Sequence, residues 1–238
     1  MIPHFKFSPL KSLQHNDKHV LQEIYWVAHP RFIFLKQVAR NGRLLDLGAG
    51  EGGAVFWKDY LRPSRNDIKM CAIDVAKGQF FDRYDDYQIV NLDTGRIKYA
   101  DDTFDAVLAS HIFEHLLDLD ATLGILFSLL KQGGRIYIEM PSSRTLDYPP
   151  RDQFLREGFP VSTTNFFDDH SHTKTYTLKE LSEMLEKHRF RIVQQGIINN
   201  RFLEDELITY GIRENDSEIA TYGVWSKLDW AQYVVAEK

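Results

Sequence analysis

The chain has a single cysteine, Cys71, which excludes any disulfide within it. This residue lies in the apolar run of residues 70–73, where a small buried side chain is expected. No stretch approaches the ~18 apolar residues of a membrane span, and the N-terminus lacks the apolar core of a signal peptide. These absences predict a cytoplasmic protein that does not cross a membrane.

Positive charge is also scarce. The 34 aspartates and glutamates outnumber the 29 lysines and arginines, and the formal net charge is −5. General nucleic-acid-binding proteins usually carry a basic face, so nucleic acid is disfavoured as a partner. The 238 residues, of which 43% are apolar, suffice for one α/β domain with additions. The oligomeric state stays open, and a homodimer is among the alternatives.

The rest of the chain is organised around residues 44–53, Leu-Leu-Asp-Leu-Gly-Ala-Gly-Glu-Gly-Gly. An apolar strand is followed by closely spaced glycines, and residues 54–60 are expected to begin a helix. This order opens a nucleotide-binding α/β unit. Gly48 and Gly50 permit a tight turn and the close approach of a ligand. The helix is expected to offer free N–H groups to a carboxylate or phosphate.

Two ligand templates fit this stretch. The glycines satisfy G-x-G-x-x-G, the dinucleotide fingerprint, and together with Asp46 they also satisfy D-x-G-x-G-x-G. Asp46 and Glu51 would repel a pyrophosphate, whereas they would attract a ligand that carries sulfonium and ammonium groups. At this point the chain resembles the class I S-adenosylmethionine-dependent methyltransferases, whose first motif has this form. An NAD-dependent oxidoreductase is the less favoured alternative.

A second strand, residues 69–73, is closed by Asp74, 22 residues after Gly52. An acid about 20 residues beyond a glycine loop typically accepts hydrogen bonds from ribose hydroxyls. The resemblance implies the same task for Asp74. A third strand, residues 87–91, precedes Asp93, and the resemblance implies that this acid accepts from the adenine amino group. Turn formation by Asp93 is the plainer alternative.

Further motifs extend the resemblance to residues 44–141. An F-D-x-V strand within residues 102–110 leads into His-Ile-Phe-Glu-His-Leu at 111–116, and a leucine-rich helix with L-K-x-G-G precedes a strand that Pro141 stops. The cofactor, S-adenosylmethionine, is the one that the resemblance implies. The cofactor-binding residues expected on this basis are Asp46, Gly48, Ala49, Gly50, Gly52, Asp74, Val75, Leu92, Asp93, Ser110, His111 and His115.

The predicted fold is α/β and doubly wound, or Rossmann-like, with a seven-stranded, mostly parallel sheet and helices on both faces. In the resembling family the last strand is antiparallel and lies between the fifth and sixth. Residues 1–238 are expected to form a single methyltransferase domain. Its expected parts are an N-terminal helical cap at 1–40, a cofactor-binding core at 41–141, a lid or acceptor insertion at 142–176, and the C-terminal part of the sheet at 177–238.

Local patterns predict further elements. Asn16-Asp17 caps a helix that runs to Val27, and a second helix is expected at residues 31–40. Residues 201–228 give the weakest pattern, with a helix expected at 204–208 and a turn at 215–217.

A hydroxyl acceptor needs a general base, and a histidine is suited to that role near neutral pH. Our candidates are His170 and His172, with Asp169 orienting the ring. The plainer alternative, favoured about equally, is that Asp168 and Asp169 begin a turn and the histidines bond the backbone. His111 is a secondary candidate, and His115 is expected beside the cofactor or in packing.

Metal chemistry is not predicted. His111-Ile112-Phe113-Glu114-His115 matches the H-x-x-E-H zinc-protease signature, but the string directly follows a strand instead of lying on a long helix. A divalent ion at residues 168–172 stays open as an aid to acceptor binding.

The sequence therefore predicts an S-adenosylmethionine-dependent methyltransferase that acts on a small molecule or a sugar-linked metabolite. Oxygen is the favoured acceptor atom, because Ser110-His111-Ile112-Phe113 stands where amino-directed enzymes of nucleic acids and proteins carry N-P-P-Y. A non-catalytic subunit that binds S-adenosylmethionine or activates a partner is the alternative.

Overall fold

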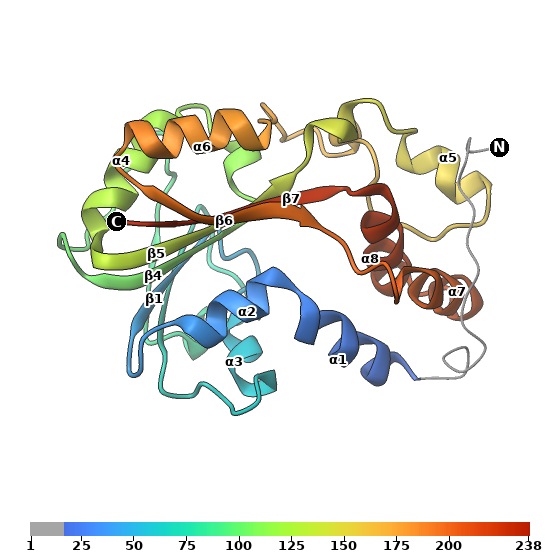
Figure 1. Cartoon of the computed structure of the whole chain (residues 1–238), viewed down its shortest axis with the longest axis horizontal. Coiled ribbons are helices and arrows are strands. Elements are labelled where there is room, and N and C mark those ends of the chain that lie inside the picture. The colour runs from blue at the N-terminus through green and yellow to red at the C-terminus, as the bar shows by residue number, and fades with distance from the viewer. Residues whose placement is uncertain (1–16) are drawn as a thin grey trace. The chain divides into compact units, whose positions relative to one another are not determined.

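The computed structural model describes residues 17–238, so Asn16 and the segment before it lie outside the described residues. Its sheet has seven strands in the order β3-β2-β1-β4-β5-β7-β6 (Figure 1). The strands are β1 Arg43–Leu47, β2 Lys69–Asp74, β3 Asp86–Ile89, β4 Phe104–Ser110, β5 Leu130–Pro141, β6 Arg191–Ile198 and β7 Ala231–Glu237.

Strands β1 to β5 pair in parallel, as predicted. The last strand, β7, runs antiparallel to β5. Its hydrogen bonds show this directly, because Gly133 N–H donates to Lys238 at one end and Ser142 N–H donates to Trp230 at the other. As the residue number rises along one strand, it falls along its partner. The predicted Rossmann-like topology is therefore confirmed, including the place of β7 between β5 and β6.

By its internal contacts the chain divides into two compact units. The sheet unit comprises residues 31–140, 176–196 and 233–238. The helical unit comprises the described residues up to 30, together with 141–175 and 197–232. The N-terminal helix, the lid insertion and the weakly patterned stretch thus belong to one unit. The single-domain organisation stays a prediction.

Helices cover both faces of the sheet unit (Figure 1). Helices α4 Leu119–Leu129 and α6 Leu178–Lys187 lie on one face, and α2 Pro30–Gln37 and α3 Trp57–Tyr60 lie on the other. Because side chains alternate along a strand, Leu45 and Leu47 point into the core cluster that includes Leu123 and Leu181. Asp46, between the two leucines, therefore points to the α2 and α3 face.

The expected helix at residues 54–60 is much shorter than the sequence indicated. Gly52 adopts a left-handed conformation, a 3-10 turn covers Gly53–Phe56, and α3 then has only four residues. So short a helix has little macrodipole. The macrodipole therefore gives little support to the predicted binding of a carboxylate or phosphate at the N-terminus of α3, which stays a prediction.

Four α-helices form the helical unit: α1 Lys18–Ala28, α5 Arg151–Arg156, α7 Glu204–Glu214 and α8 Ser217–Leu228. The side chain of Asp17 caps α1, as predicted. Helix α7 is longer than expected, and α8 was not anticipated. The turn at 215–217 is confirmed, with Asn215 in a left-handed conformation at φ 51°. No helix of residues 17–238 is long and apolar enough to span a membrane.

The α7–α8 hairpin depends on the small size of Gly211. A Cβ at this residue would lie 2.5 Å from the Cβ of Ala220, closer than two carbon atoms can pack. Trp225 and Trp230 stack with ring centroids 3.9 Å apart. Their indole N–H groups donate to the carbonyls of Thr163 and Thr164. These contacts hold residues 163–164 of the predicted lid insertion against the end of α8 and the residue before β7.

Gly211→Ala should lower the free energy of unfolding by about 1–3 kcal/mol, because the added methyl group overpacks the α7–α8 contact. Gly124→Ala, in the middle of α4, is the matched control. Its Cβ would meet the His188 ring at 3.6 Å, an ordinary contact, so helix propensity should raise stability by up to ~1 kcal/mol. Urea denaturation measures both changes. Equal effects of the two substitutions would contradict this account of the hairpin.

Candidate functional site

Residues from several strands meet at one edge of the sheet unit. Strand β1 lies between β2 and β4 in a parallel arrangement, so the carboxyl ends of all three strands lie side by side. Ligands of open α/β sheets bind at this edge, where the strand order reverses. The edge brings together the loop of residues 48–53, Asp74 at the end of β2, and Ser110 and His111 at the end of β4.

The glycine loop packs tightly on one side and is open on the other. Gly48 has φ +71°, and a Cβ there would lie 2.7 Å from the Ile112 side chain. Its N–H and that of Ala49 donate to the Ile73 carbonyl at 2.8 and 3.1 Å. Gly50 also has a positive φ, but nothing lies within 4 Å of its Cβ position. Contacts with Ile112 and Ile73 thus fix the loop on one side, whereas Gly50 leaves its other side accessible.

Asp74 joins the glycine loop to β2. Its Oδ2 accepts from Gly50 N–H at 2.7 Å, and its Oδ1 accepts from Val75 N–H at 2.7 Å. Oδ1 also accepts from Ala76 N–H at 3.4 Å. Each carboxylate oxygen can accept about two hydrogen bonds, so Oδ2 retains capacity for a ligand hydroxyl. The side chain of Val75 is largely exposed beside it.

Asp46 is buried, unlike Asp74. Its Oδ2 accepts from the Tyr84 hydroxyl at 2.5 Å. Burial raises the pKa of Asp46 to about 6, although the Tyr84 hydrogen bond and the positive charge of Arg31 oppose that rise. At neutral pH Asp46 is therefore mostly ionised, and it carries a buried negative charge close to the carboxyl edge of the sheet.

The third acid, Asp93, is tied to the segment after β4. Its Oδ1 accepts from the N–H groups of Leu117 and Asp118 at 2.9 and 3.3 Å. Leu92 packs against the core cluster, and His115 lies half-buried at the end of the 3-10 turn Phe113–His115. Asp93 thus fixes the backbone of residues 117–118.

The comparison with protein families identifies this arrangement. A family model described as a methyltransferase domain matches residues 21–195. The chain belongs to this methyltransferase family. It thus contains the domain of S-adenosylmethionine-dependent methyltransferases, as the sequence predicted.

Two curated methyltransferases are similar to part of this chain. The ubiquinone/menaquinone biosynthesis C-methyltransferase UbiE of Desulfotalea psychrophila is 28% identical over 126 residues, 50% of each chain. The mitochondrial ubiquinone biosynthesis O-methyltransferase of Homo sapiens is 28% identical over 116 residues, 44% of this chain and 30% of that protein. The matches span at most half the length of these relatives.

Solved methyltransferase structures share the fold. An S-adenosylmethionine-dependent methyltransferase from Mesorhizobium loti has a TM-score of 0.55 at 15% identity, covering 88% of this chain and 96% of that one. Phosphoethanolamine N-methyltransferase 2 from Haemonchus contortus, in complex with S-adenosylhomocysteine, has a TM-score of 0.60 at 18% identity. That match covers 87% of this chain and 52% of the other.

The residues of the methyltransferase edge fit S-adenosylmethionine. Gly50 leaves open space at the loop, Asp74 retains acceptor capacity for a ribose diol, and Asp46 places negative charge where a cationic cofactor needs it. When bound, the cofactor supplies an activated methyl carbon. The individual contacts of the predicted cofactor-binding residues stay predictions.

His111 is held between two carboxylates. Its Nδ1 lies 3.2 Å from Glu114 Oε1 and its Nε2 lies 3.0 Å from Glu139 Oε1. Burial alone lowers the pKa of His111, but the hydrogen bonds and charges of the two glutamates outweigh it and raise the pKa to about 9. An imidazolium with both nitrogens engaged is a poor general base, so this geometry disfavours the secondary candidate.

Sequence reasoning missed Arg31 and Glu139. The guanidinium of Arg31, from α2, forms a two-pronged ion pair with Glu139 near the end of β5. The Tyr137 hydroxyl donates to the same carboxylate at 2.6 Å. A signal was present, because each is a charged residue inside an apolar stretch, at residues 31–35 and 136–140.

The predicted histidine cluster lies in the helical unit. Asp168 accepts from the N–H groups of Arg151, Thr164 and Asn165, so its carboxylate caps backbone and is a poor candidate for a metal ligand. Asp169 accepts from Ser171 at 2.5 Å. His172 Nδ1 lies 2.6 Å from the Phe166 carbonyl, whereas His170 is exposed.

The zinc-protease interpretation fails on conformation. His111 has φ 54° and precedes the 3-10 turn that contains His115. The two histidines therefore do not share the helix that such a zinc site requires.

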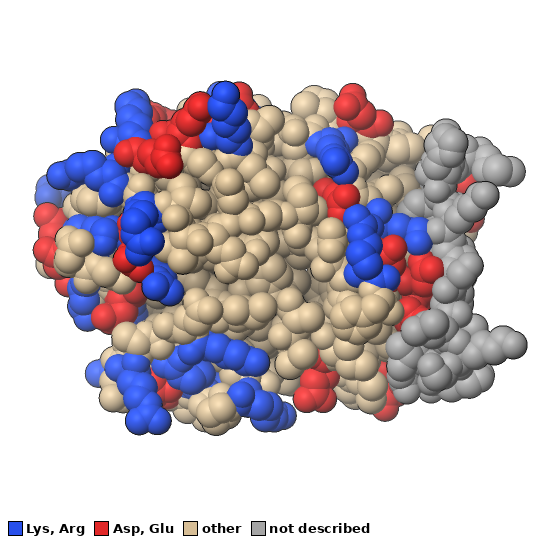
Figure 2. Space-filling model, in the orientation of Figure 1, with Lys and Arg blue, Asp and Glu red and all other residues tan. Residues whose placement is uncertain are grey.

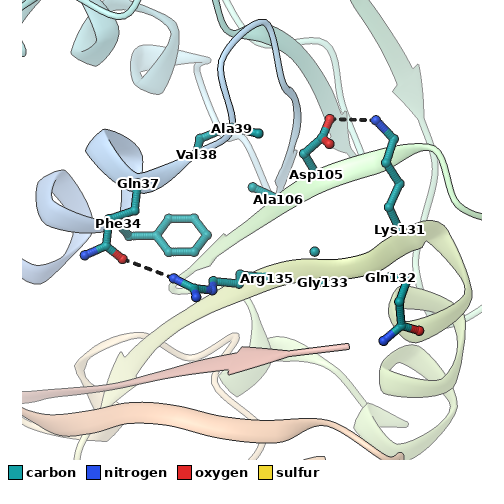
Figure 3. A pocket seen from close by; sticks show the side chains of 11 residues that line it. Phe34, Gln37, Val38, Ala39, Asp105, Ala106, Lys131, Gln132, Gly133 and Arg135 are labelled. Carbon is teal, nitrogen blue, oxygen red and sulfur yellow. Dashed lines mark hydrogen bonds and ion pairs between the residues drawn. The ribbon is translucent and has the colours of Figure 1, made fainter.

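A pocket of about 380 Å³ lies at the opposite edge of the sheet unit, next to the start of β4 and the hairpin at residues 131–135 (Figure 3). Lys131 and Arg135 line it, but each is paired with an acid, Asp105 and Glu237. Figure 2 shows both signs of charge interspersed at this end of the unit. The pocket therefore lacks the unpaired charge of an ion-binding site.

Asp74→Ala should weaken binding of S-adenosylhomocysteine by tenfold or more, because two ribose hydroxyls lose a charged acceptor worth about 1.5–3 kcal/mol. Asp82→Ala is the matched control, since the Asp82 side chain is exposed and its carboxylate pairs with Lys77. Isothermal titration calorimetry measures both. Unchanged affinity in folded Asp74→Ala protein would remove Asp74 from the site.

The affinity for S-adenosylmethionine should fall as the pH is lowered through about 6. The cationic cofactor favours ionised Asp46, so protonation of this carboxyl opposes binding. Between pH 7 and pH 5 the dissociation constant should rise by about tenfold. Asp46→Asn protein should bind more weakly and lack this dependence. Equal wild-type affinities at pH 5 and pH 7 would contradict the role of Asp46.

Proposed function

We propose that the enzyme transfers the methyl group of S-adenosylmethionine to a hydroxyl oxygen of a small molecule. The absence of N-P-P-Y after β4 supports oxygen over an amino nitrogen. The acidic net charge of −5 supports a small acceptor over nucleic acid. Both curated proteins with partial similarity are named for ubiquinone biosynthesis, one as a C-methyltransferase and one as an O-methyltransferase.

The observation that carries the proposal is the orientation of His172. The 2.6 Å contact of Nδ1 with the Phe166 carbonyl requires a proton on Nδ1, because a carbonyl only accepts. In the neutral ring, Nε2 is then the nitrogen that takes a proton. The ring also packs against Phe166, with centroids 4.6 Å apart. We infer that His172, and not the exposed His170, is the general base.

Methyl transfer to oxygen needs one proton to leave. When bound, S-adenosylmethionine would supply the methyl group to the acceptor oxygen, and Nε2 of His172 would take the proton that the hydroxyl loses. The base later returns this proton to solvent. Asp169 Oδ2, 3.9 Å from Nε2, is placed to attract the imidazolium that forms.

Carbon methylation of a hydroxy-aromatic ring is the second candidate, because one partial relative is named as a C-methyltransferase. Removal of the ring hydroxyl proton makes the neighbouring carbon nucleophilic. After that carbon is methylated, its ring C–H proton must leave and the oxygen must regain a proton, so the same base can serve both reactions. NMR of a product carrying a ¹³C-methyl group separates them, since O-methyl and C-methyl carbons have distinct chemical shifts.

His172→Ala should lower kcat by about 10²–10⁴-fold and leave cofactor affinity unchanged. His170→Ala, two residues away and exposed, should keep wild-type turnover. Steady-state methylation of a hydroxy-aromatic acceptor identified by screening measures both. Full turnover in His172→Ala protein would exclude this histidine as the base, as would a loss that added Mg²⁺, Mn²⁺ or Zn²⁺ restores.

A further inference from the structure

Four charged side chains are gathered in the interior of the sheet unit. Arg31 comes from α2, Glu139 from β5, and His111 and Glu114 from the segment that follows β4. The side chains of Arg31, Glu139 and Glu114 are 9%, 3% and 0% exposed, and that of His111 is 25% exposed. We call these four residues the charge network. Only His111 among them was a candidate for the general base, and its geometry disfavours that role.

Glu139 is the centre of the charge network. Its Oε1 accepts from Arg31 and from His111, and its Oε2 accepts from Arg31 Nε at 3.0 Å and from Tyr137 at 2.6 Å. Four donors fill the capacity of one carboxylate. His111 in turn meets carboxylate oxygens at both nitrogens, which requires both to carry protons.

Stability alone does not account for such a network. Buried ion pairs rarely stabilise a fold more than apolar side chains of similar volume do. They are useful where a definite geometry must be fixed. The backbone at His111 needs fixing, because its φ of 54° is unfavourable for a non-glycine residue. Its N–H donates to the Glu139 carbonyl at 2.8 Å, so Glu139 holds both its backbone and its ring.

The residues after His111 reach two parts of the cofactor edge. Ile112 occupies the space that a Cβ at Gly48 would fill, and the N–H groups of Leu117 and Asp118 bond Asp93. The conformation of residues 111–118 therefore determines what supports the glycine loop and how Asp93 is oriented.

Arg31 acts on the edge from the other side. Its guanidinium lies over the Trp57 ring, 4.7 Å from the ring centre. Trp57 begins α3, which the 3-10 turn Gly53–Phe56 joins to the glycine loop. The charge of Arg31 also lowers the pKa of Asp46. The charge network is thus linked to three features of the cofactor edge: the packing beneath the glycine loop, the orientation of Asp93 and the pKa of Asp46.

We propose that Arg31, Glu139 and His111 are positioning residues for cofactor binding, and that they hold residues 111–118 in the binding conformation only while His111 is protonated. The inference rests on the cofactor and not on the identity of the acceptor. The groups that face His111 are Glu114 from its own segment and Glu139 from β5. Arg31 and Tyr137 donate hydrogen bonds to Glu139. The positive charge of Arg31 also lowers the pKa of Asp46 on β1.

Loss of the His111 proton removes a hydrogen bond from one glutamate. Cofactor affinity should therefore fall as the pH rises through about 9, the pKa of this ring. In Glu139→Gln protein one negative partner is gone, so the pKa of His111 should drop toward its ordinary range. The decline in affinity should then begin at a lower pH. A purely structural role would weaken binding without moving this transition.

The experiment is a calorimetric titration with S-adenosylhomocysteine from pH 6.5 to 9.5, paired with NMR of ¹⁵N-histidine-labelled protein. Wild-type His111 should titrate above pH 8, and affinity should decline with it. His111→Asn, which tolerates a left-handed backbone, should bind tenfold or more weakly and show no alkaline transition. Glu139→Gln should shift both the titration and the decline downward by at least one pH unit.

Glu237→Gln is the matched control. Glu237 also pairs with two arginines, Arg135 and Arg191, but at the opposite end of the sheet unit, so wild-type behaviour is expected. Titration of wild-type His111 below pH 7.5 would overturn the inference. So would His111→Asn protein that binds as the wild type does at every pH. Absence of any wild-type binding would refute the cofactor assignment, whereas the NMR titration still decides the state of the network.

Discussion

The contact between Gly48 and Ile112 is the constraint on which the cofactor edge depends. Gly48 follows β1 and Ile112 follows β4, so this contact joins the loops that leave two adjacent parallel strands. It is possible only without a Cβ at Gly48, where the nearest Ile112 atom would be 2.7 Å away. The glycine is therefore needed for packing beneath the loop, whereas Gly50 leaves the ligand side open.

Electrostatics follows from the same arrangement. The carboxyl edge carries Asp46, Asp74 and Asp93, a set suited to a cofactor with a sulfonium and an ammonium group and unsuited to a pyrophosphate. The buried positive charge of Arg31 is matched by Glu139 instead of being left to neutralise the acids at the edge. Ion pairing in the interior thus preserves negative charge at the edge where we expect the cofactor to bind.

Much of the fold could be predicted because its signals are local. Apolar runs bounded by glycine, aspartate or proline mark β1, β2, β4 and β5, and their order fixes a parallel sheet. Helix α8 lacked such a signal. Its buried positions include Thr221, Gly223 and Ser226 as well as apolar residues, so no apolar stripe of helical period stands out. The short α3 escaped prediction because Gly52 adopts a left-handed conformation that the sequence permits but does not require.

The site, like the fold, was predictable only where its signals are local or follow from the order of the strands. Asp46 lies near the carboxyl end of β1 and Asp74 is the last residue of β2, so topology alone brings them toward one edge. The pairing of Arg31 with Glu139 joins residues 108 positions apart, and no local pattern indicates such a partner. Asp168 behaves as the plainer of the two alternatives had it. Although it lies beside two histidines in the sequence, its carboxylate accepts from the backbone N–H groups of residues 151, 164 and 165.

The central claim is that this edge binds S-adenosylmethionine. Parallel calorimetric titrations of the wild-type protein with S-adenosylhomocysteine and with NAD⁺ at pH 7.5 test it most directly. We expect micromolar binding of S-adenosylhomocysteine and no measurable binding of NAD⁺, because the acids of the edge repel a pyrophosphate. Tight binding of NAD⁺ without binding of S-adenosylhomocysteine would contradict it.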